Sequence, residues 1–291
     1  MPGPLQTARA VVVPRGGAVR IAQTLLDANV IAAPLSFRLA MLATLPDGPL
    51  RAAEFSFPPH ASLREVLAIL RTAKPVEHRL TIPEGLTARQ VTALLDHTDA
   101  LTGTVTVSDE GAVLPDTYDY EYGITRAAVL ARAEAAEAKA LATAWAERDP
   151  TVPLASPRAA LILASIVERE TARPEERAHI AAVFLNRLRL GMRLQADSTV
   201  TYAASGGLGT LDHPLTRGDL DRDGPYNTYR NHDLPPGPIC APGIASLHAV
   251  LHPAASDDLY FVADGTGGHV FARTMAQHDA NVKRWRSLES H

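Results

Sequence analysis

Cysteine, aromatic residues and long apolar runs are all scarce in this sequence of 291 residues. Cys240 is the one cysteine, which excludes an internal disulfide and a zinc site built from cysteines. The first 40 residues contain no apolar stretch of about 18 residues, so they predict no transmembrane helix. The short run VVV is followed directly by Pro14, so no signal peptide is predicted either.

Signatures of several common enzyme classes are missing as well. No GxSxG, GxGxxG or P-loop pattern occurs, which argues against serine-hydrolase chemistry and against a nucleotide cofactor. The 11 histidines include no HExxH spacing. His248 and His252 lie four residues apart and are the alternative for a zinc site, but no paired cysteine or carboxylate accompanies them. We therefore expect neither a metal nor a cofactor.

The composition is typical of a globular protein with a sizeable core. Hydrophobic residues make up 46% of the chain and charged residues 21%. That is enough for one large domain or for two or three smaller ones. The net charge of -4 argues against nucleic acid as the main partner.

The N-terminal third carries a weak internal repeat. Residues 11–26 and 80–95 align without gaps, and residues 54–70 form a degenerate third copy. Each copy is a β-prone run, a turn with proline and an amphipathic helix, and capping-box spacings at Ser62 and Thr87 mark two helix starts. Such units predict small α/β modules. They are either a purely structural repeat or a LysM-like, glycan-binding region.

We predict an α+β fold in three parts. Residues 1–100 form the repeat region, with the LysM-like module at about 78–100. Residues 101–155 form a connector, in which the Ala-rich residues 125–147 predict one long helix. Residues 156–291 form a mixed α+β domain.

The most informative segment begins the third part. A Ser-Pro start predicts a helix over residues 156–171, in which Glu170 shares an apolar face with its neighbours and Glu168 points outward. A second helix is expected over residues 175–190, ended by Gly191. Further along the chain, a β-hairpin and a C-terminal helix are expected.

Glu170 is the candidate catalytic residue. A carboxyl group held against apolar side chains has a raised pKa, because burial disfavours the charged form. At neutral pH such a group can hold a proton and donate it, and cleavage of a glycosidic bond is the reaction that most often needs such an acid. Glu168 is the second choice. The alternative for Glu170 is an ion pair with Arg173 or Arg187.

Polar and aromatic side chains follow the two helices. Residues 193–200 alternate in polarity, which predicts a strand whose polar row faces either a cleft or solvent. The proline-rich residues 225–243 predict a long irregular loop, a common place for function. Sugars bind through hydrogen bonds to their hydroxyls and through aromatic contacts with their rings. The candidate substrate-binding residues are Gln195, Asp197, Thr199, Tyr226, Asn227 and Tyr229.

Four segments together resemble the YceG/MltG-like family of endolytic murein transglycosylases. They are LASIVERET, VFLNRLRLGMRLQADSTV, the YNTY…LPPGPI…PG loop and the HPA…LYFVADGTGGHVF hairpin. The resemblance covers the chain from about residue 156, and TIPEG and LPDTY extend it more weakly to the N-terminal part. It implies a C-terminal catalytic domain with a glycan cleft.

The resemblance also implies an activity. Family members cut peptidoglycan glycan strands internally, at the β-1,4 bond between N-acetylmuramic acid and N-acetylglucosamine, and leave a 1,6-anhydromuramoyl end. Glu170 would be the acid and base, with no metal or cofactor. The expected location is the periplasmic face of the inner membrane, held by an N-terminal anchor that this sequence does not show. Peptidoglycan synthases of the elongation or division machinery are the expected partners.

The chain departs from the usual family pattern at two points. Asp197-Ser198-Thr199 stands where Asp-Pro-Thr is common, and EGAVLPDTY replaces a more aromatic segment. Two rival functions stay open. One is a muramidase that uses Glu170 as acid and Asp197 to assist a water molecule. The other is a non-catalytic peptidoglycan-binding scaffold.

Overall fold

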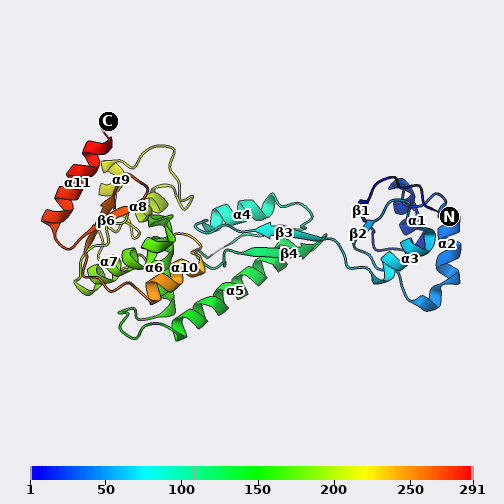
Figure 1. Ribbon diagram of the computed structural model, residues 1–291, viewed down its shortest axis with the longest axis horizontal. Helices are drawn as coiled ribbons and strands as arrows, with labels where there is room; N and C mark the ends of the chain where they lie inside the picture. Colours follow the sequence, from blue (N-terminus) through cyan, green and yellow to red (C-terminus); the bar gives the residue numbers. More distant parts are fainter. Residues whose placement is uncertain (1, 108, 290–291) are drawn as a thin grey trace. The chain divides into compact units, whose positions relative to one another are not determined.

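The computed structural model describes residues 2–107 and 109–289, which form two compact units (Figure 1). Within the described residues, unit 1 covers the ranges Met1–Leu80, Asp99–Gly103 and Asp119–Thr125. Within the described residues, unit 2 covers the ranges Thr81–Thr98, Thr104–Tyr118 and Arg126–His291. The predicted α+β class is confirmed: helices dominate, and the strands pair two by two.

Unit 1 contains two of the predicted strand–helix repeats. Strand β1 (Arg9–Val12) pairs antiparallel with β2 (Glu54–Phe57). Each strand is followed by its helix, α1 (Ala18–Asp27) and α3 (Leu63–Thr72) respectively. The predicted capping box at Ser62 is present: the Ser62 hydroxyl accepts the backbone N–H of Glu65, and the Glu65 carboxylate accepts the backbone N–H of Ser62.

A helix that the sequence pattern did not indicate completes unit 1. Helix α2 (Pro34–Ala43) and the short 3-10 helix η1 (Leu45–Asp47) lie between the two repeats. Phe37 is the one buried residue of α2, and it shares a core with Phe55 and Phe57 of β2. All three rings are fully buried.

The repeat copy at residues 80–95 forms the end of β3 (Glu77–Thr81) and most of α4 (Ala88–Asp96), with the predicted capping box at Thr87. Strand β3 pairs with β4 (Thr117–Glu121), which lies inside the connector predicted over residues 101–155. The LPDTY sequence (residues 114–118) therefore leads into strand β4, which begins at Thr117.

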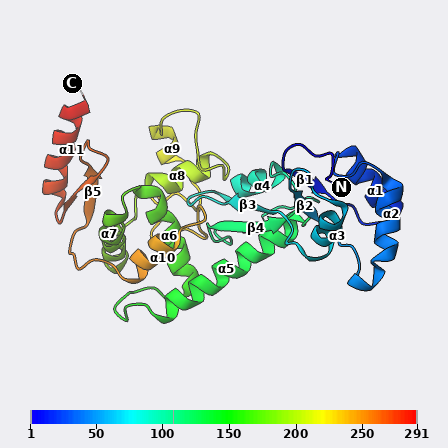
Figure 2. The same cartoon turned by 45° about the vertical axis from the view of Figure 1, so that its right-hand side comes forward.

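Unit 2 is organised around one central helix. The helices α5 (Arg126–Ala146), α7 (Arg177–Arg189) and α10 (Ile244–Leu251) all pack against α6 (Pro157–Glu170), as Figure 2 also shows. Ser156 caps α6 as predicted, because its side chain accepts the backbone N–H of the third helical residue. The 3-10 helix η2 (Pro174–Glu176) leads into α7.

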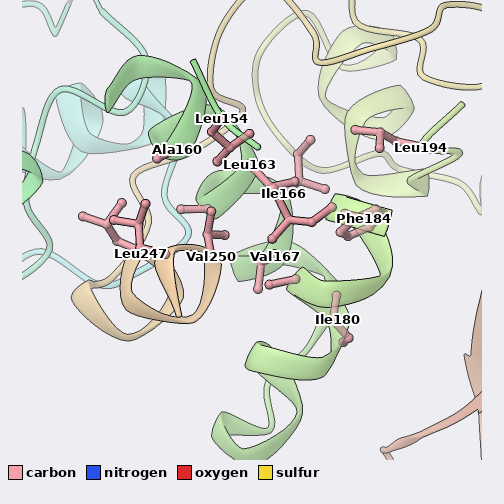
Figure 3. Close-up of a cluster of buried hydrophobic side chains, with 14 of the residues drawn as sticks. Leu154, Ala160, Leu163, Ile166, Val167, Ile180, Phe184, Leu194, Leu247 and Val250 are labelled. Carbon is pink, nitrogen blue, oxygen red and sulfur yellow. The ribbon is translucent and has the colours of Figure 1, made fainter. Parts of the chain in front are cut away.

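The core of unit 2 lies on both sides of α6. Figure 3 shows Ile166 and Val167 of α6 between Val250 of α10 and Ile180 and Phe184 of α7. None of these five side chains is more than 1% exposed. Each fully buried side chain of this kind contributes about 1.5–3 kcal/mol relative to an exposed one. The position of α6 is therefore set by packing along nearly its whole length.

The strand expected over residues 193–200 is absent, and that prediction was wrong. Gln195 has a φ of 51°, which an extended strand does not allow, and helix α8 (Asp197–Ala204) begins two residues later. The polar alternation came from a turn that enters a helix with an acidic residue in its first turn, where the helix dipole favours negative charge.

The C-terminal elements follow the prediction. Helix α9 (Arg217–Asp221) precedes the irregular loop, and β5 (Tyr260–Ala263) pairs antiparallel with β6 (His269–Ala272) to form the hairpin. Helix α11 (Met275–Glu289) packs against both strands. None of the helices formed by the described residues has the length and apolar character that crossing a bilayer requires.

Glu137 of α5 is a buried carboxyl group with an unsatisfied oxygen. The residue is 4% exposed, and its Oε1 has no hydrogen-bond partner among the described residues. Burial raises the pKa of Glu137 to about 7. Ionised Glu137 is therefore costly in the folded protein.

We expect Glu137→Gln to stabilise unit 2 at pH 8 and to change its stability little at pH 4. The unfolded chain releases this proton near the ordinary value of 4.5, whereas the folded protein holds it until about pH 7, so stability falls as the pH rises through this window. The loss is up to about 3 kcal/mol, and glutamine removes it. Urea unfolding followed by the fluorescence of Trp145 and Trp285, both in unit 2, measures the difference. Glu134→Gln, exposed on the same helix, is the control; equal gains at both pH values would contradict the explanation.

Candidate active site

A cavity of about 340 Å³ in unit 2 has Glu170 in its wall. Six segments that lie far apart in the sequence contribute to it: the end of α6, helix α7, the turn before α8 with the start of α8, the long loop, β5 and α11. The lining residues are Glu170, Arg187, Leu194, Gln195, Asp197, Tyr229, Tyr260, Phe261, Met275 and His278.

A larger hollow of about 570 Å³ lies in unit 1, around Arg15 and Arg51. The carboxyl group among its lining residues belongs to Glu121, which is exposed. The hollow in unit 1 therefore has no buried carboxyl group among its lining residues. The cavity at Glu170 combines a perturbed carboxyl group with aromatic walls, and so it is the better candidate.

Glu170 is the last residue of α6, at the point where the buried helix reaches the cavity. Burial raises the pKa of its carboxyl group, and the nearby charge of Asp197 raises it further. The hydrogen bond from the Ser198 side chain acts in the opposite direction and outweighs the effect of Asp197. The Ser198 backbone and the charge of His269 also lower the pKa, but the net shift is upward because burial is the largest cause. The C-terminal end of a helix also disfavours a negative charge. Glu170 thus keeps its proton to a higher pH than an ordinary glutamate.

The ion pair considered as the alternative for Glu170 is not formed. Arg173 donates to the carbonyl oxygen of Thr266 at 2.6 Å. Arg187 is 7% exposed and donates to the carbonyl oxygens of Leu259 at 2.6 Å and Leu194 at 2.8 Å. No salt bridge to Glu170 occurs in the described part of the chain.

The first two residues of α8 approach the acid. The hydroxyl of Ser198 donates to Oε1 of Glu170 at 2.6 Å. Asp197 accepts a short hydrogen bond from the hydroxyl of Tyr229, which arrives from the long loop. Burial and this contact with Asp197 raise the pKa of Tyr229, so its hydroxyl stays a donor.

Thr228 connects the long loop to the start of α8 through hydrogen bonds. Its carbonyl oxygen accepts the N–H of Gln195 at 3.1 Å, and its hydroxyl accepts the N–H of Ala196 at 3.0 Å. The hydroxyls of Thr199 and Thr228 lie 2.9 Å apart, both fully or almost fully buried. These bonds bring Asp197 and Tyr229, 32 positions apart in the sequence, to one side of the cavity.

The predicted binding residues divide into two groups. Gln195, Asp197 and Tyr229 line the cavity with Glu170. Thr199, Tyr226 and Asn227 do not. Thr199 is fully buried against Thr228, and Asn227 is 2% exposed, donating to two carbonyl oxygens of the preceding segment at 2.8 and 2.7 Å. The ring of Tyr226 lies 5.0 Å from that of Tyr202. Thr199 is turned inward because residues 197–204 form a helix and not the expected strand, and Tyr226 and Asn227 are likewise absent from the residues that line the cavity.

Glu168 does not point outward, and the helical phase that predicted this was misleading. Its side chain is 5% exposed and forms an ion pair with Arg177 at 3.1 Å. Its second oxygen accepts the backbone N–H of Gly243 at 2.9 Å. The physical reason is that α6 is packed on several sides, so the face opposite Glu170 is also covered. Both oxygens of Glu168 are already engaged, and it is absent from the cavity lining.

The sequence pattern did not identify several residues that line the cavity. Arg187 lies seven residues after Ile180, on the same inward face of α7, which is a signal that could have identified it. Its guanidinium also lies over the ring of Tyr260, 5.1 Å from the centroid. Tyr260 and Phe261 lie in the predicted hairpin, but only the tertiary fold shows that they line the same cavity as Glu170. Ser198 does not line the cavity but contacts Glu170, and in the sequence it stands out only as a departure from a family pattern.

His248 and His252, the alternative for a zinc site, lie at the end of α10. His248 and His252 stack on α10 with ring centroids 4.4 Å apart. Within residues 2–107 and 109–289, no three or more His, Cys, Asp and Glu side chains gather as metal ligands would. The chemistry that the cavity itself offers is proton transfer by Glu170 beside aromatic faces and hydrogen-bonding groups.

Two curated relatives share a similar segment. The endolytic murein transglycosylase of Bacillus subtilis (strain 168) is 42% identical over 130 residues, which are 45% of this chain and 35% of that protein. The endolytic murein transglycosylase of Streptococcus pneumoniae (serotype 2, strain D39) is 42% identical over 126 residues, 42% of this chain and 22% of that protein. The match therefore spans about a third of the length of the first relative and less of the second.

Similarity over a longer stretch comes from a structure and a family profile. A 2.6 Å crystal structure of a YceG-like protein, lmo1499 from Listeria monocytogenes, superposes with a TM-score of 0.60 and 28% sequence identity. The alignment covers 94% of this chain and 98% of that one. The YceG-like family profile matches residues 11–284. With nearly its whole length matched, this chain belongs to the YceG-like family.

Proposed function

We propose that this protein is an endolytic murein transglycosylase. It cleaves the β-1,4 bond between N-acetylmuramic acid and N-acetylglucosamine inside glycan strands and leaves a 1,6-anhydromuramoyl end. The observation that carries the proposal is Glu170, a carboxyl group of raised pKa in the wall of a cavity with aromatic sides. The names of the two relatives point to the same substrate.

One carboxyl group is enough for this reaction. Protonated Glu170 donates to the glycosidic oxygen as the bond breaks through an oxocarbenium-like state. The resulting carboxylate then takes the proton from the muramoyl 6-hydroxyl, whose oxygen closes onto the anomeric carbon. The proton count balances, and no water is consumed. A hydrolase instead needs a second carboxylate as base or nucleophile.

The rest of the cavity suits a glycan. Gln195 and Asp197 are exposed at its edge and can bond to sugar hydroxyls, and Tyr229, Tyr260 and Phe261 provide aromatic surface. The LysM-like segment at about 78–100 is a second glycan-binding candidate. Since peptidoglycan lies outside the cytoplasmic membrane, we place the enzyme at the periplasmic face of the inner membrane, beside the peptidoglycan synthases.

Glu170→Gln should lower the rate by about 10²–10⁴-fold, because glutamine cannot donate the proton. Binding of glycan should persist, since the side chain keeps its size and polarity. Mass spectrometry of purified peptidoglycan after incubation measures new anhydromuramoyl ends inside strands. Reducing muramic acid ends in the wild-type digest would instead establish a muramidase, and no new ends from the wild-type protein would favour the binding scaffold.

Two further variants control this experiment. Glu175→Gln changes an exposed carboxyl group five residues away and should leave the rate unchanged. Glu168→Gln should act through stability, because it weakens the ion pair with Arg177. Full activity in Glu170→Gln together with an inactive but folded Glu168→Gln would transfer the catalytic role to Glu168.

The pH dependence supplies an independent prediction. The rate should fall as the pH rises through the raised pKa of Glu170, because the acid must be protonated. Asp197 raises that pKa through its charge, so Asp197→Asn should move the alkaline limb of kcat/KM to lower pH. Asp212→Asn, at a site that is 96% exposed, should not move it. A limb that stays in place in Asp197→Asn, or moves to higher pH, would show that Asp197 does not act on the proton donor.

A further inference from the structure

Ser198 holds one particular oxygen of the proposed acid. Its hydroxyl lies 2.6 Å from Oε1 of Glu170, at the short end of the range for an O–H donor and a carboxyl oxygen. The contact joins the second residue of α8 to the last residue of α6, and the two helices pack directly against each other. The packing of the two helices therefore fixes the positions of the two backbones that carry this contact.

The backbone strengthens this contact. The first N–H groups of a helix have no partner within it and carry a partial positive charge. The N–H of Ser198 is one of them, and it favours the ionised form of Glu170 together with the hydroxyl. Glu170 thus lies between the negative end of α6 and the positive end of α8. Ser198 is the residue through which the second helix reaches it.

We propose that Ser198 is a positioning residue that gives the two oxygens of Glu170 different tasks. Oε1 is occupied by the Ser198 hydroxyl, which leaves Oε2 to carry the proton that is exchanged with the glycan. This assignment rests on the proposed transglycosylase function. It concerns a residue that does not line the cavity itself and acts through the acid.

Both halves of the reaction benefit from this arrangement. In the first, the proton on Oε2 moves to the glycosidic oxygen as the bond to the anomeric carbon breaks. In the second, the muramoyl 6-hydroxyl oxygen bonds to that carbon, and its proton returns to Oε2. Between the two steps Glu170 is a carboxylate, and a hydrogen bond to an ionised group is roughly twice as strong as one between neutral groups. Ser198 therefore stabilises the intermediate state more than the starting state.

Other groups around Glu170 also influence its proton. Asp197 from α8 raises the pKa of Glu170, as does burial, whereas Ser198 and His269 of β6 lower it. The remaining titratable or charged groups that line the same cavity are Arg187 of α7, Tyr229 of the loop, Tyr260 of β5 and His278 of α11. Removing the Ser198 hydroxyl leaves all of these in place, so its effect can be isolated.

The experiment titrates Glu170 directly in the full chain. Carboxyl ¹³C NMR of glutamate-labelled protein, with Glu170→Gln to assign the signal, follows the group from pH 3 to pH 9. Ser198→Ala should raise its titration midpoint, because the carboxylate loses a donor. Ser198→Thr keeps a hydroxyl and should restore a midpoint near that of the wild type. An unchanged or lowered midpoint in Ser198→Ala overturns the proposal.

Kinetics on peptidoglycan form the second readout. Ser198→Ala should lower kcat by about 10- to 100-fold, the loss expected for one hydrogen bond to a charged group, with KM little changed. The alkaline limb of its pH profile should move upward with the NMR midpoint, and Ser198→Thr should recover both. A purely structural role would change stability without moving the midpoint, and that result counts against the proposal.

The two readouts separate this inference from the proposed function. If the wild-type protein produces no anhydromuramoyl ends but the midpoint shifts in Ser198→Ala, the contact with Glu170 stands and the proposed reaction fails. If the wild-type protein produces these ends and Ser198→Ala alters neither the midpoint nor kcat, the reaction stands and the positioning role fails.

Discussion

The candidate site depends on the burial of α6. This helix packs against α5, α7, α8 and α10, and eight of its residues in succession, from Ala160 to Val167, are buried. A helix fixed in this way carries its last side chain to a defined place, where the surrounding protein buries the carboxyl group. The raised pKa of Glu170 is a direct consequence, because the same packing that positions the carboxyl group also removes the solvent that would stabilise its charge.

Two glutamates in the same stretch show how the surroundings decide a role. Glu168 lies opposite the guanidinium of Arg177 and accepts a backbone N–H from Gly243, so its charge is compensated inside the protein. Glu84 shares the same guanidinium at 3.4 Å. Glu170 has the Ser198 hydroxyl and no salt-bridge cation within the described residues. The first carboxyl group joins segments of the fold, whereas the second lacks such a cation in the described part of the chain and is the group that we propose as the acid.

Hydrogen bonds connect the segments that bring Asp197 and Tyr229 to the cavity. Thr228 connects the irregular loop to the turn before α8, and Asn227 closes the loop on its own preceding carbonyl oxygens. Because these side chains are buried and paired, an otherwise irregular segment has a defined shape. This arrangement explains why a long loop can present Tyr229 to Asp197 at hydrogen-bond distance.

The sequence by itself determined the local elements and the identity of the acid that we propose. Capping boxes at Ser62 and Thr87, the Ser-Pro start of α6 and the apolar spacing along it depend on interactions within a few residues, so they are legible in the chain. The structure of residues 193–200 could not be read from their alternating polarity, because Gln195 and Ala196 form hydrogen bonds with Thr228, more than 30 positions away. Only the tertiary structure decided that Glu168 is paired, that Arg187, Tyr260 and Phe261 share the cavity with Glu170, and that Ser198 holds one of its oxygens. Each of these facts is a contact between distant segments, and a contact of that kind exists only once the helices have packed.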